Sequence, residues 1–536
     1  MPLNKQFQTV VSRLPRPVLR GLILLAFTSA AMIFLNFLGR YGINEGVWDA
    51  SSYSDRRGGS SGVGAFRKMS NWAIPNHPSG IPRPNKARQN GTLAQPAHQG
   101  FSRTPIIGRD EYNLGALPSL EEAFARLEPK LREVKDAVLK IPREHALWSP
   151  ILAPYITEDN QRRYHHLRSD WDEQTQDWVP STKRYLFVTV CRQVAGMLAD
   201  WFAAWTVLAN YLGPESMVFS LLEGDSADGR LSLYPACYSH SPNESSTPPT
   251  PGEIISMVLR EHLLFLGVLP ENIHIRTRLP AIDWEAEHRI EILAKLRNGG
   301  MRPLYDSLPS GLTPDGHPWT AIIYYNDVYL SATHFLELMH QHVMQDADMT
   351  CGWDHAGRFF YDGWIGRDMS GDLYTPFPLK EEDRDLPQKV FINHPSTKER
   401  FDRLLPFQVF AGWNGITVLS PTPFLPPYNV QFRRGATAPP GSGLSSADVE
   451  CQQSECGLIS WDFWKYGFGR IQVVPGVHAT YSKADAMMRG WIEFPLEEEG
   501  YTEAITWQDR PPAMIRCHDW PDLPGKGEIA LITYTL

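Results

Sequence analysis

The stretch AIIYYND, residues 321–327, decides the fold class of this chain. Its apolar run from Ala321 to Tyr325 is short and rich in β-branched and aromatic side chains, which predicts a buried strand. The run ends abruptly in Asn326 and Asp327. Open α/β sheets bind their ligands beyond the carboxyl ends of their strands. The stretch therefore predicts both a sheet and the edge at which its site lies.

Strands and helices alternate upstream of this strand. We expect strands at 185–190, 217–222 and 272–276, and helices at 196–212, 253–268 and 284–297. Such alternation is typical of a mainly parallel sheet with helices on both faces. The predicted fold class is α/β, with a Rossmann-type, mainly parallel sheet and flanking helices in a domain that spans residues 184–481.

The N-terminus predicts a membrane anchor. Residues 21–38 carry no charge, and with Val18 and Leu19 they reach the length that a bilayer requires of a helix. Only basic charges precede this run, so the positive-inside rule places residues 1–17 in the cytosol and the rest in the lumen. A cleaved signal peptide is the alternative, but the run is longer than its usual apolar core. We expect a single-pass type II membrane protein, with the Golgi membrane as the default location.

Three further segments flank the predicted domain. Residues 39–115 are rich in Ser, Gly, Pro and Asn, which predicts a flexible stem. Residues 116–183 begin with a helical pattern, because apolar side chains recur at steps of three and four along 118–141. We expect this helix to pack on the catalytic body, although a stem coiled coil that makes a homodimer is the alternative. Residues 482–536 form a C-terminal extension.

Composition fits a luminal protein better than a nucleic-acid binder. The net charge is −9, and the chain lacks the basic stripe that nucleic-acid binding requires. Asn90 and Asn243 each begin an N-glycosylation tripeptide. All six cysteines follow the predicted anchor, in a compartment that permits disulfides, but the sequence does not resolve their pairing.

Acidic and amide side chains gather at the predicted strand ends. They are Glu223, Asp225, Asp228, Asn326, Asp327, Asp346 and Asp348. Mg²⁺ and Mn²⁺ prefer oxygen ligands and usually take only one or two carboxylates together with phosphate oxygens. The first three residues have an ordinary turn as their alternative, since Asp and Gly also serve turns for backbone reasons. Asp346 and Asp348 form a literal D-x-D pair, although such pairs are common in solvated turns.

The stretch FYDGWIGRD, residues 360–368, is the most specific motif of the chain. Trp364 offers an apolar wall on which a sugar or a base can stack. Arg367 can bind a phosphate with two parallel hydrogen bonds, and Asp362 or Asp368 could bind sugar hydroxyls or act as a base. A buried pair of Arg367 and Asp368 that stabilises a loop is the alternative.

Two later segments add polar and aromatic candidates. The turn WNG contains Trp413 and Asn414, and the run SEC contains Glu455 and Cys456. Trp413, Asn414 and Glu455 are plausible substrate contacts, whereas Cys456 is better explained as a structural thiol. His478 follows a β-like run, where a lone histidine is more often packed than bound to a metal.

In this order the motifs resemble those of the fungal cryptococcal mannosyltransferase family. The matches are E-x-x-S-x-D-G after a strand, D-x-D-M-x-C, F-Y-D-x-W-x-x-R-D, the W-N-G turn and the S-E-C run, spread over about 184–481. The resemblance implies a GT-A-like fold and an enzyme that transfers mannose from GDP-mannose to a mannosyl acceptor glycan in α-1,3 linkage. It also implies a metal-dependent reaction, with Mn²⁺ or Mg²⁺ bridging the diphosphate.

The resemblance also implies residue roles. For donor binding they are Glu223, Asp225, Asp228, Asn326 and Trp364; for acceptor binding Trp413 and Asn414; for catalysis Asp362, Arg367, Asp368 and Glu455; and for the metal Asp327 with Asp346 or Asp348. The chain departs from a clean D-x-D at residues 326–328, which read Asn-Asp-Val. Two alternatives stay open: a glycoside hydrolase, whose paired carboxylates need no metal, and a non-catalytic luminal factor for polysaccharide assembly or export.

Overall fold

A computed structural model describes part of the chain. The described residues are 158–168, 171–172, 177–179, 181–224, 251–277, 288–356, 359–376, 389–489, 492–495, 503–518 and 531–535, all within the compact unit 66–536. The predicted cytosolic tail, anchor at 18–38, stem and helix at 118–141 lie outside these residues, as do Asp225 and Asp228. None of the helices within the described ranges is both long and apolar enough to cross a membrane.

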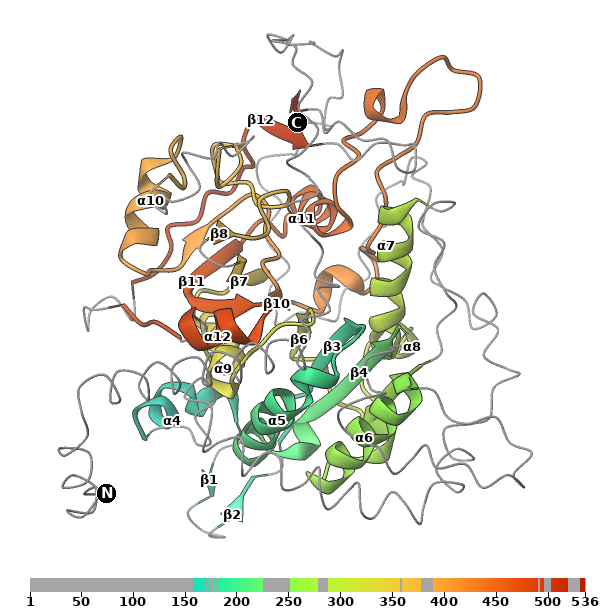
Figure 1. Cartoon of the computed structure of the whole chain (residues 1–536), viewed down its shortest axis with the longest axis vertical. Coiled ribbons are helices and arrows are strands. Elements are labelled where there is room, and N and C mark those ends of the chain that lie inside the picture. The colour runs from blue at the N-terminus through green and yellow to red at the C-terminus, as the bar shows by residue number, and fades with distance from the viewer. Residues whose placement is uncertain are drawn as a thin grey trace, which may run out of the picture. The chain divides into compact units, whose positions relative to one another are not determined.

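A nine-stranded sheet forms the centre of the described fold (Figure 1). Its strands are β3 (Tyr185–Cys191), β4 (Met217–Glu223), β5 (Ile273–Arg276), β6 (Ala321–Tyr325), β7 (Met349–Ala356), β8 (Phe359–Phe360), β9 (Phe407–Gln408), β10 (Ile416–Leu419) and β11 (Ile471–Thr480). The order is β5-β4-β3-β6-β10-β7-β11-β9, with β8 paired to β7. Two small ladders pair β1 (Trp171–Asp172) with β2 (Asp177–Trp178), and β12 (Met514–His518) with β13 (Leu531–Thr535).

The sheet is mixed, which corrects the expectation of a mainly parallel sheet. The strand β3 pairs in parallel with β4 and β6, and β4 pairs in parallel with β5, as the alternation of strands and helices predicts. However, β10 runs antiparallel to both β6 and β7, and β9 and β8 also run antiparallel to their neighbours. The strand β10 could not be predicted from the sequence, because its four residues, ITVL, are too few to show a period.

Helices cover both faces of the sheet (Figure 1). They are α4 (Glu158–Tyr164), α5 (Leu198–Leu212), α6 (Pro251–Phe265), α7 (Arg289–Gly300), α8 (Arg302–Asp306), α9 (Ala332–Met344), α10 (Pro395–Asp402), α11 (Glu455–Lys465) and α12 (Lys483–Arg489). Shorter 3-10 helices are η3 (His165–Leu167), η4 (Ala195–Met197), η5 (Pro214–Ser216), η8 (Pro270–Asn272), η10 (Thr422–Phe424) and η11 (Ser446–Asp448). The predicted helices at 196–212, 253–268 and 284–297 correspond to α5, α6 and α7, with shifted ends.

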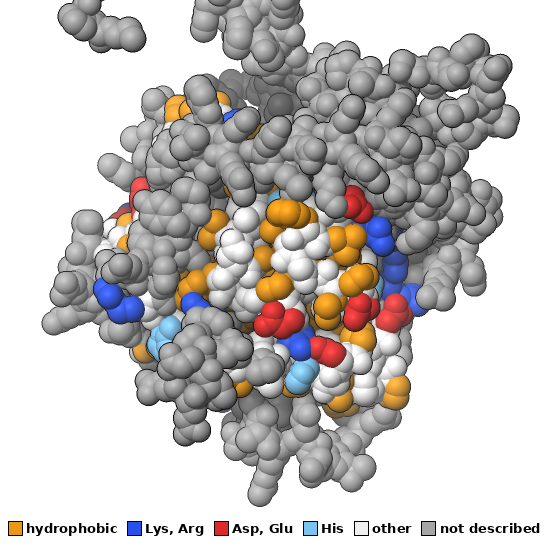
Figure 2. All heavy atoms as spheres, turned by 90° about the horizontal axis from the view of Figure 1, so that it is seen from below, with side chains coloured by type: hydrophobic (Ala, Val, Ile, Leu, Met, Phe, Trp, Pro, Cys, Tyr) orange, Lys and Arg blue, Asp and Glu red, His pale blue; other side chains and the backbone are white. Residues whose placement is uncertain are grey.

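Alternate side chains of each inner strand enter different cores. Along β3, Tyr185 and Phe187 join the core that contains α5, α6 and α9, whereas Leu186 and Val188 join the core that contains α7 and α11. This alternation follows from the two-residue period of a strand, and burial on both faces explains the nearly continuous apolar runs. On the face seen from below, apolar side chains lie among charged side chains of both signs (Figure 2).

Segments outside the predicted 184–481 domain also pack on the sheet body. Arg163 of α4 donates two hydrogen bonds, each 2.8 Å long, to the carboxylate of Glu337 in α9. Cys517 of β12 forms a disulfide with Cys451. Among the other described cysteines, Cys191, Cys351 and Cys456 are buried and take part in no disulfide. The described ends of the chain are therefore tied to the sheet body.

Candidate active site

Six strands of the described sheet direct their carboxyl ends to one edge. The parallel pairings of β3 with β4 and β6, of β4 with β5, and of β7 with β11, together with the two antiparallel pairings of β10, fix this common direction. Asn326 and Asp327 follow β6 at this edge, Asp354 lies near the end of β7, and Tyr481 follows β11. The strand end expected at residues 326 and 327 is confirmed.

A chain of hydrogen bonds crosses this edge from β6 to β11. Trp413 Nε1 donates to Asn326 Oδ1 over 3.3 Å, and Asn326 Nδ2 donates to the hydroxyl oxygen of Tyr481 over 3.3 Å. The Tyr481 hydroxyl donates to Asp354 Oδ2 over 3.2 Å. Asn326 therefore links the turn before β10, through its amide oxygen, to the residue after β11, through its amide nitrogen.

A second set of bonds brings Asp362 to Asp354. The backbone N–H of Asp362 donates to Asp354 Oδ1 over 3.3 Å, and the backbone N–H of Asn414 donates to Asp362 Oδ2 over 2.9 Å. Asn414 adopts a φ of 58°, a left-handed conformation that asparagine tolerates better than most residues. Its side-chain nitrogen donates to the carbonyl oxygen of Gly352 over 2.7 Å. The WNG turn therefore aims a backbone donor at Asp362.

The two carboxyls of Asp354 and Asp362 titrate together at raised pKa. Burial and then the charge of Asp362 raise the pKa of Asp354 well above its ordinary value. Burial raises the pKa of Asp362 to about 6, although the Asn414 N–H and the charge of Arg297 oppose the shift. Paired acids with pKa values pushed toward neutrality are typical of functional sites.

Arg297 brings a positive charge to the same site from α7. Its Nε donates to Glu455 Oε1 over 2.8 Å, and the Glu455 side chain is only 1% exposed. The guanidinium lies 4.5 Å from the ring centre of Trp413 and 5.3 Å from that of Tyr324. An arginine held between two rings and one carboxylate keeps a fixed orientation. Its charge also lowers the pKa of Asp327, which burial raises.

Asp327 lies at the same edge as Asp354 and Asp362. Its neighbour Asn326 is linked through the Tyr481 hydroxyl to Asp354, which also accepts a bond from the Asp362 N–H. Burial, followed by the charges of Asp362, Asp354 and Asp327, raises the pKa of Tyr361 to about 12. We call Asp327, Asp354, Asp362 and Arg297 the acid cluster.

The sequence model of the family described as Cryptococcal mannosyltransferase 1 matches residues 184–462, which contain the whole acid cluster. The chain belongs to this family. A curated relative, alpha-1,3-mannosyltransferase CMT1 of Cryptococcus neoformans var. neoformans serotype D, is 36% identical over 394 residues, which cover 70% of this chain and 74% of the relative. This family member is therefore a glycosyltransferase, and such an enzyme takes a sugar donor and a glycan acceptor.

A solved structure gives a much weaker likeness. It is named as a UDP-N-acetylglucosamine pyrophosphorylase from Entamoeba histolytica, with 12% identity and a TM-score of 0.26, and the match covers 49% of this chain and 62% of that chain. At that score the likeness says nothing further about the glycosyltransferase.

The carboxylates of the acid cluster are oxygen donors of the kind that hard divalent cations prefer. No three His, Cys, Asp or Glu side chains of the described residues converge as a ready-made metal cage. However, Mg²⁺ usually needs only one or two carboxylates, because waters and substrate phosphates complete its shell. Asp327 is partly exposed at the strand end, with Asp354 and Asp362 nearby, so this glycosyltransferase presents oxygen donors of the required kind.

Asp346 and Asp348 do not join Asp327, which corrects the sequence prediction. They precede β7, and the pairing of Leu419 with both Ile322 and Met349 places them beside the start of β6. Asp348 is thus level with Ala321, six residues before Asp327, so at about 3.3 Å per residue roughly 20 Å of strand separates them. Asp346 and Asp348 are instead both bonded to Arg470. Asp346 pairs with the Arg470 side chain, and Asp348 Oδ2 accepts a bond of 3.0 Å from the backbone N–H of Arg470.

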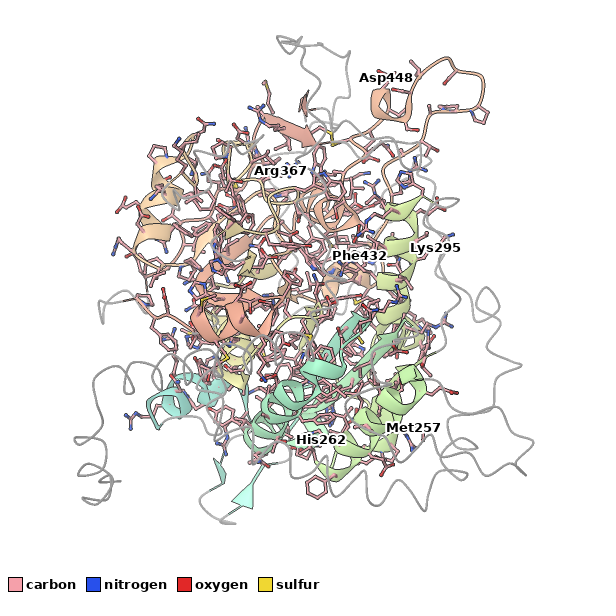
Figure 3. All side chains as sticks on the ribbon, in the orientation of Figure 1. Met257, His262, Lys295, Arg367, Phe432 and Asp448 are labelled. Atoms are coloured by element: carbon pink, nitrogen blue, oxygen red, sulfur yellow. A yellow bond between two sulfur atoms is a disulfide. The ribbon has the colours of Figure 1, made fainter. Side chains whose placement is uncertain are left out.

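Arg367 and Asp368 also lie outside the acid cluster. Arg367 is fully buried, and its guanidinium donates to the backbone carbonyl oxygens of Arg516 and Trp364, so it supports β12 rather than a phosphate. Figure 3 shows Arg367 near β12 and away from α7, which carries Lys295. Asp368 Oδ1 accepts a 2.8 Å bond from the Ser370 N–H within a turn. The alternative, a buried pair of Arg367 and Asp368, does not form either.

The predicted substrate contacts have mixed outcomes. Trp413 and Asn414 are buried and bonded to the body, so they position other groups instead of facing an acceptor. Glu223 is fully buried and accepts a 2.8 Å bond from Thr277 Oγ1, and its carboxylate lies so close to Gly252 that a Cβ there would meet it at 2.1 Å. Asn326 lies in the site, whereas donor binding by the partly exposed Trp364 stays a prediction.

The sequence prediction missed several residues of the site. Asp354 lies in an acidic window but outside any motif, and Arg297 is one of several basic residues on its helix. Tyr361 and Tyr481 carry no distinctive spacing. Their positions depend on strand register and on which face of the helix contacts the sheet, and a single sequence shows neither.

The histidines considered from the sequence are packed in the protein. Nδ1 of His478 lies 2.9 Å from Nε2 of His355. In α9 the side chains of His334, His340 and His342 are buried.

Proposed function

We propose that this glycosyltransferase moves mannose from GDP-mannose to a mannosyl acceptor glycan in α-1,3 linkage, with Mn²⁺ or Mg²⁺. The acid cluster is the observation that carries the proposal. It joins Asp327, Asp354 and Asp362 with Arg297 at the ligand-binding edge of the sheet, inside the region that matches the family. A curated relative named as an alpha-1,3-mannosyltransferase supports the sugar and the linkage.

The topology of the sheet suggests where the donor lies. The chain moves from β3 to β4 and β5 on one side, and then returns to β6 on the other side of β3. Ligands of such sheets bind at this switch point, so the nucleotide lies beyond the ends of β3 and β6. This place brings the diphosphate to Asp327. A bound Mn²⁺ or Mg²⁺, held by the partly exposed Asp327, would neutralise the charge of the departing GDP.

The protein groups around the reacting centre have distinct roles. Asp362 receives the proton of the attacking acceptor hydroxyl, because a pKa of about 6 suits a base near neutral pH. The Asn414 N–H holds the Asp362 carboxylate in place. Arg297 keeps a positive charge beside both Asp327 and Asp362, which favours their ionised forms.

The proposal also includes location. Residues 18–38 anchor the enzyme in the Golgi membrane as a single-pass type II protein with a luminal catalytic domain. The Cys451–Cys517 disulfide supports this location, because disulfides persist in oxidising compartments. A homodimer through the helical segment stays a prediction.

A donor panel tests the proposed function. The purified full-length protein is incubated with separate nucleotide sugars, a mannosyl disaccharide and Mn²⁺, and both released nucleoside diphosphate and product mass are measured. We expect GDP release and one added hexose with GDP-mannose alone, loss of both in EDTA, and recovery with Mn²⁺. Transfer from another sugar donor would contradict the assigned donor, and undiminished transfer in EDTA would contradict the metal. Cleavage of the disaccharide without any donor would indicate a hydrolase.

A further inference from the structure

Tyr361 is an exposed aromatic side chain at the rim of the acid cluster. It is 49% exposed, whereas the residues that follow it, from Asp362 to Met369, are partly or fully buried. Its backbone N–H donates to the carbonyl oxygen of Asp354 over 3.1 Å, which ties the residue to β7. The ring therefore has a fixed base and an open face.

Tyr481 supports the Tyr361 ring from the protein side. The two ring centres lie 4.5 Å apart with an angle of 43° between the planes. The Tyr481 hydroxyl is already bonded to Asn326 and Asp354, so this second ring cannot swing away without breaking both bonds. The Tyr361 ring is consequently oriented before any ligand arrives, which lowers the entropy cost of binding.

The Tyr361 ring borders the acid cluster. Asp362 is the next residue of the chain, and the partner ring of Tyr481 donates its hydroxyl to Asp354 Oδ2 over 3.2 Å. One side of the residue thus lies beside the acid cluster, while about half of its surface stays open. An apolar face beside a few convergent polar groups is the usual composition of a small-ligand site, and it matches a pyranose, which has an apolar face and a hydroxyl rim.

The sheet order places Tyr361 on the acceptor side of Asp327. Tyr361 is bonded to β7 and Tyr481 follows β11, and β10 separates both strands from β6. At about 4.8 Å per strand, β7 lies roughly 10 Å beyond β6, on the side away from β3 and β4. A nucleotide at the β3 and β6 switch point therefore lies on the other side of Asp327.

We propose that Tyr361, supported by Tyr481, is the platform on which the terminal hexopyranose of the acceptor glycan stacks, so that one of its hydroxyls meets Asp362. This inference rests on the proposed function, because it names the acceptor contact of that same site. It predicts that the ring of Tyr361 matters for acceptor binding, whereas its hydroxyl matters little.

Two substitutions and one control test the platform in the full chain. Tyr361→Ala removes the ring, Tyr361→Phe keeps it, and Phe265→Ala removes an aromatic side chain of α6 that is 56% exposed and takes no part in the site. For each variant the KM for the mannosyl acceptor and the KM for GDP-mannose are measured separately. Equilibrium binding of methyl α-mannoside, which needs no donor, is measured alongside.

We expect Tyr361→Ala to raise the acceptor KM and the Kd for methyl α-mannoside about tenfold, as the loss of one ring contact of about 1.4 kcal/mol implies. The donor KM should stay within about twofold of the wild-type value, and Tyr361→Phe and Phe265→Ala should resemble the wild-type protein. An unchanged acceptor KM in Tyr361→Ala, or an equal rise in both KM values, would overturn the inference. If the wild-type chain binds methyl α-mannoside through Tyr361 but transfers no mannose, the proposed function fails while the platform stands.

Discussion

At the scale of single residues, burial raises the pKa of the Asp354 and Asp362 carboxyls. Neither carboxyl has a basic side chain bonded to it among the described residues, and their hydrogen-bond donors are backbone N–H groups and the Tyr481 hydroxyl. Arg297 acts on Asp362 only through its charge. Two acids in such surroundings cannot both ionise freely, so the pair retains a proton at a pH where isolated aspartates have lost theirs.

The raised pKa of Asp362 predicts a change in stability with pH. Its folded-state pKa is about 6, and its ordinary value is 3.8, so between these values the folded protein holds a proton that the unfolded chain has released. The metal-free protein should therefore lose stability as the pH rises through 6. Asp362→Asn should remove about 1–3 kcal/mol of this loss between pH 4 and 7.5.

Urea unfolding in EDTA at both pH values measures this difference. An equal dependence on pH in the wild-type protein and in Asp362→Asn would contradict the raised pKa of Asp362.

The pair of Arg297 and Glu455 gives a second prediction at this scale. Arg297→Met leaves the Glu455 carboxylate buried without its partner, which should cost about 3–5 kcal/mol of unfolding free energy. The double variant Arg297→Met with Glu455→Leu should recover most of that loss, because an apolar pair needs no compensation. Denaturant unfolding of the three proteins measures the coupling. If the single and double variants are equally unstable, the ion pair is not the source of the loss.

At the scale of elements, apolar runs predicted the strands well and their pairing poorly. The runs at 185–190, 217–222 and 321–325 became β3, β4 and β6, because strands buried on both faces are nearly continuous apolar segments. The strand β10 follows a turn that requires Asn414 at φ 58°, and nothing local shows that the chain reverses there to pair with both β6 and β7. That reversal decides where β7, with Asp354, lies relative to β6 and Asp327, so the acid cluster could be predicted only in part.

The strand β12 is bonded to two loops that lie next to site residues, residues 366–372 after Asp362 and residues 451–454 before Glu455. Arg516 accepts a bond from Arg367 at its carbonyl oxygen, its side chain pairs with Asp372, and its backbone N–H donates to the carbonyl oxygen of Gly371. The next residue, Cys517, is bonded to Cys451, only four positions before Glu455. The burial of Arg367 is thus explained by its bond to β12, although the motif that contains Arg367 predicted phosphate binding.

Removal of the disulfide should loosen both loops. The variant with Cys451→Ser and Cys517→Ser should lose about 2–4 kcal/mol of stability and should exchange amide hydrogens faster at residues 366–372 and 451–456. Cys191→Ala, which removes a buried thiol outside any disulfide, is the control. Unchanged exchange in both loops of the double variant would show that β12 does not hold them.

At the scale of the whole molecule, the site depends on segments far apart in sequence. The family match ends at residue 462, yet Tyr481 and β11 lie beyond it, and β11 pairs with both β7 and β9. The acidic motifs of the sequence analysis therefore separate into two groups. Asp327 and Asp362 reach the edge where the strands end, whereas Asp346, Asp348 and Asp368 support the structure elsewhere.

Mannosyl transfer by a matched pair of variants tests this separation most directly. Asp327→Asn and Asp346→Asn each remove one carboxylate, but Asp346 is exposed at the opposite edge, where it pairs with Arg470. With GDP-mannose, Mn²⁺ and a mannosyl acceptor, we expect Asp327→Asn to reduce kcat/KM by about 100-fold or more, and Asp346→Asn to stay within about threefold of the wild-type value. Equal losses, or a larger loss in Asp346→Asn, would contradict the placement of the active site at the acid cluster.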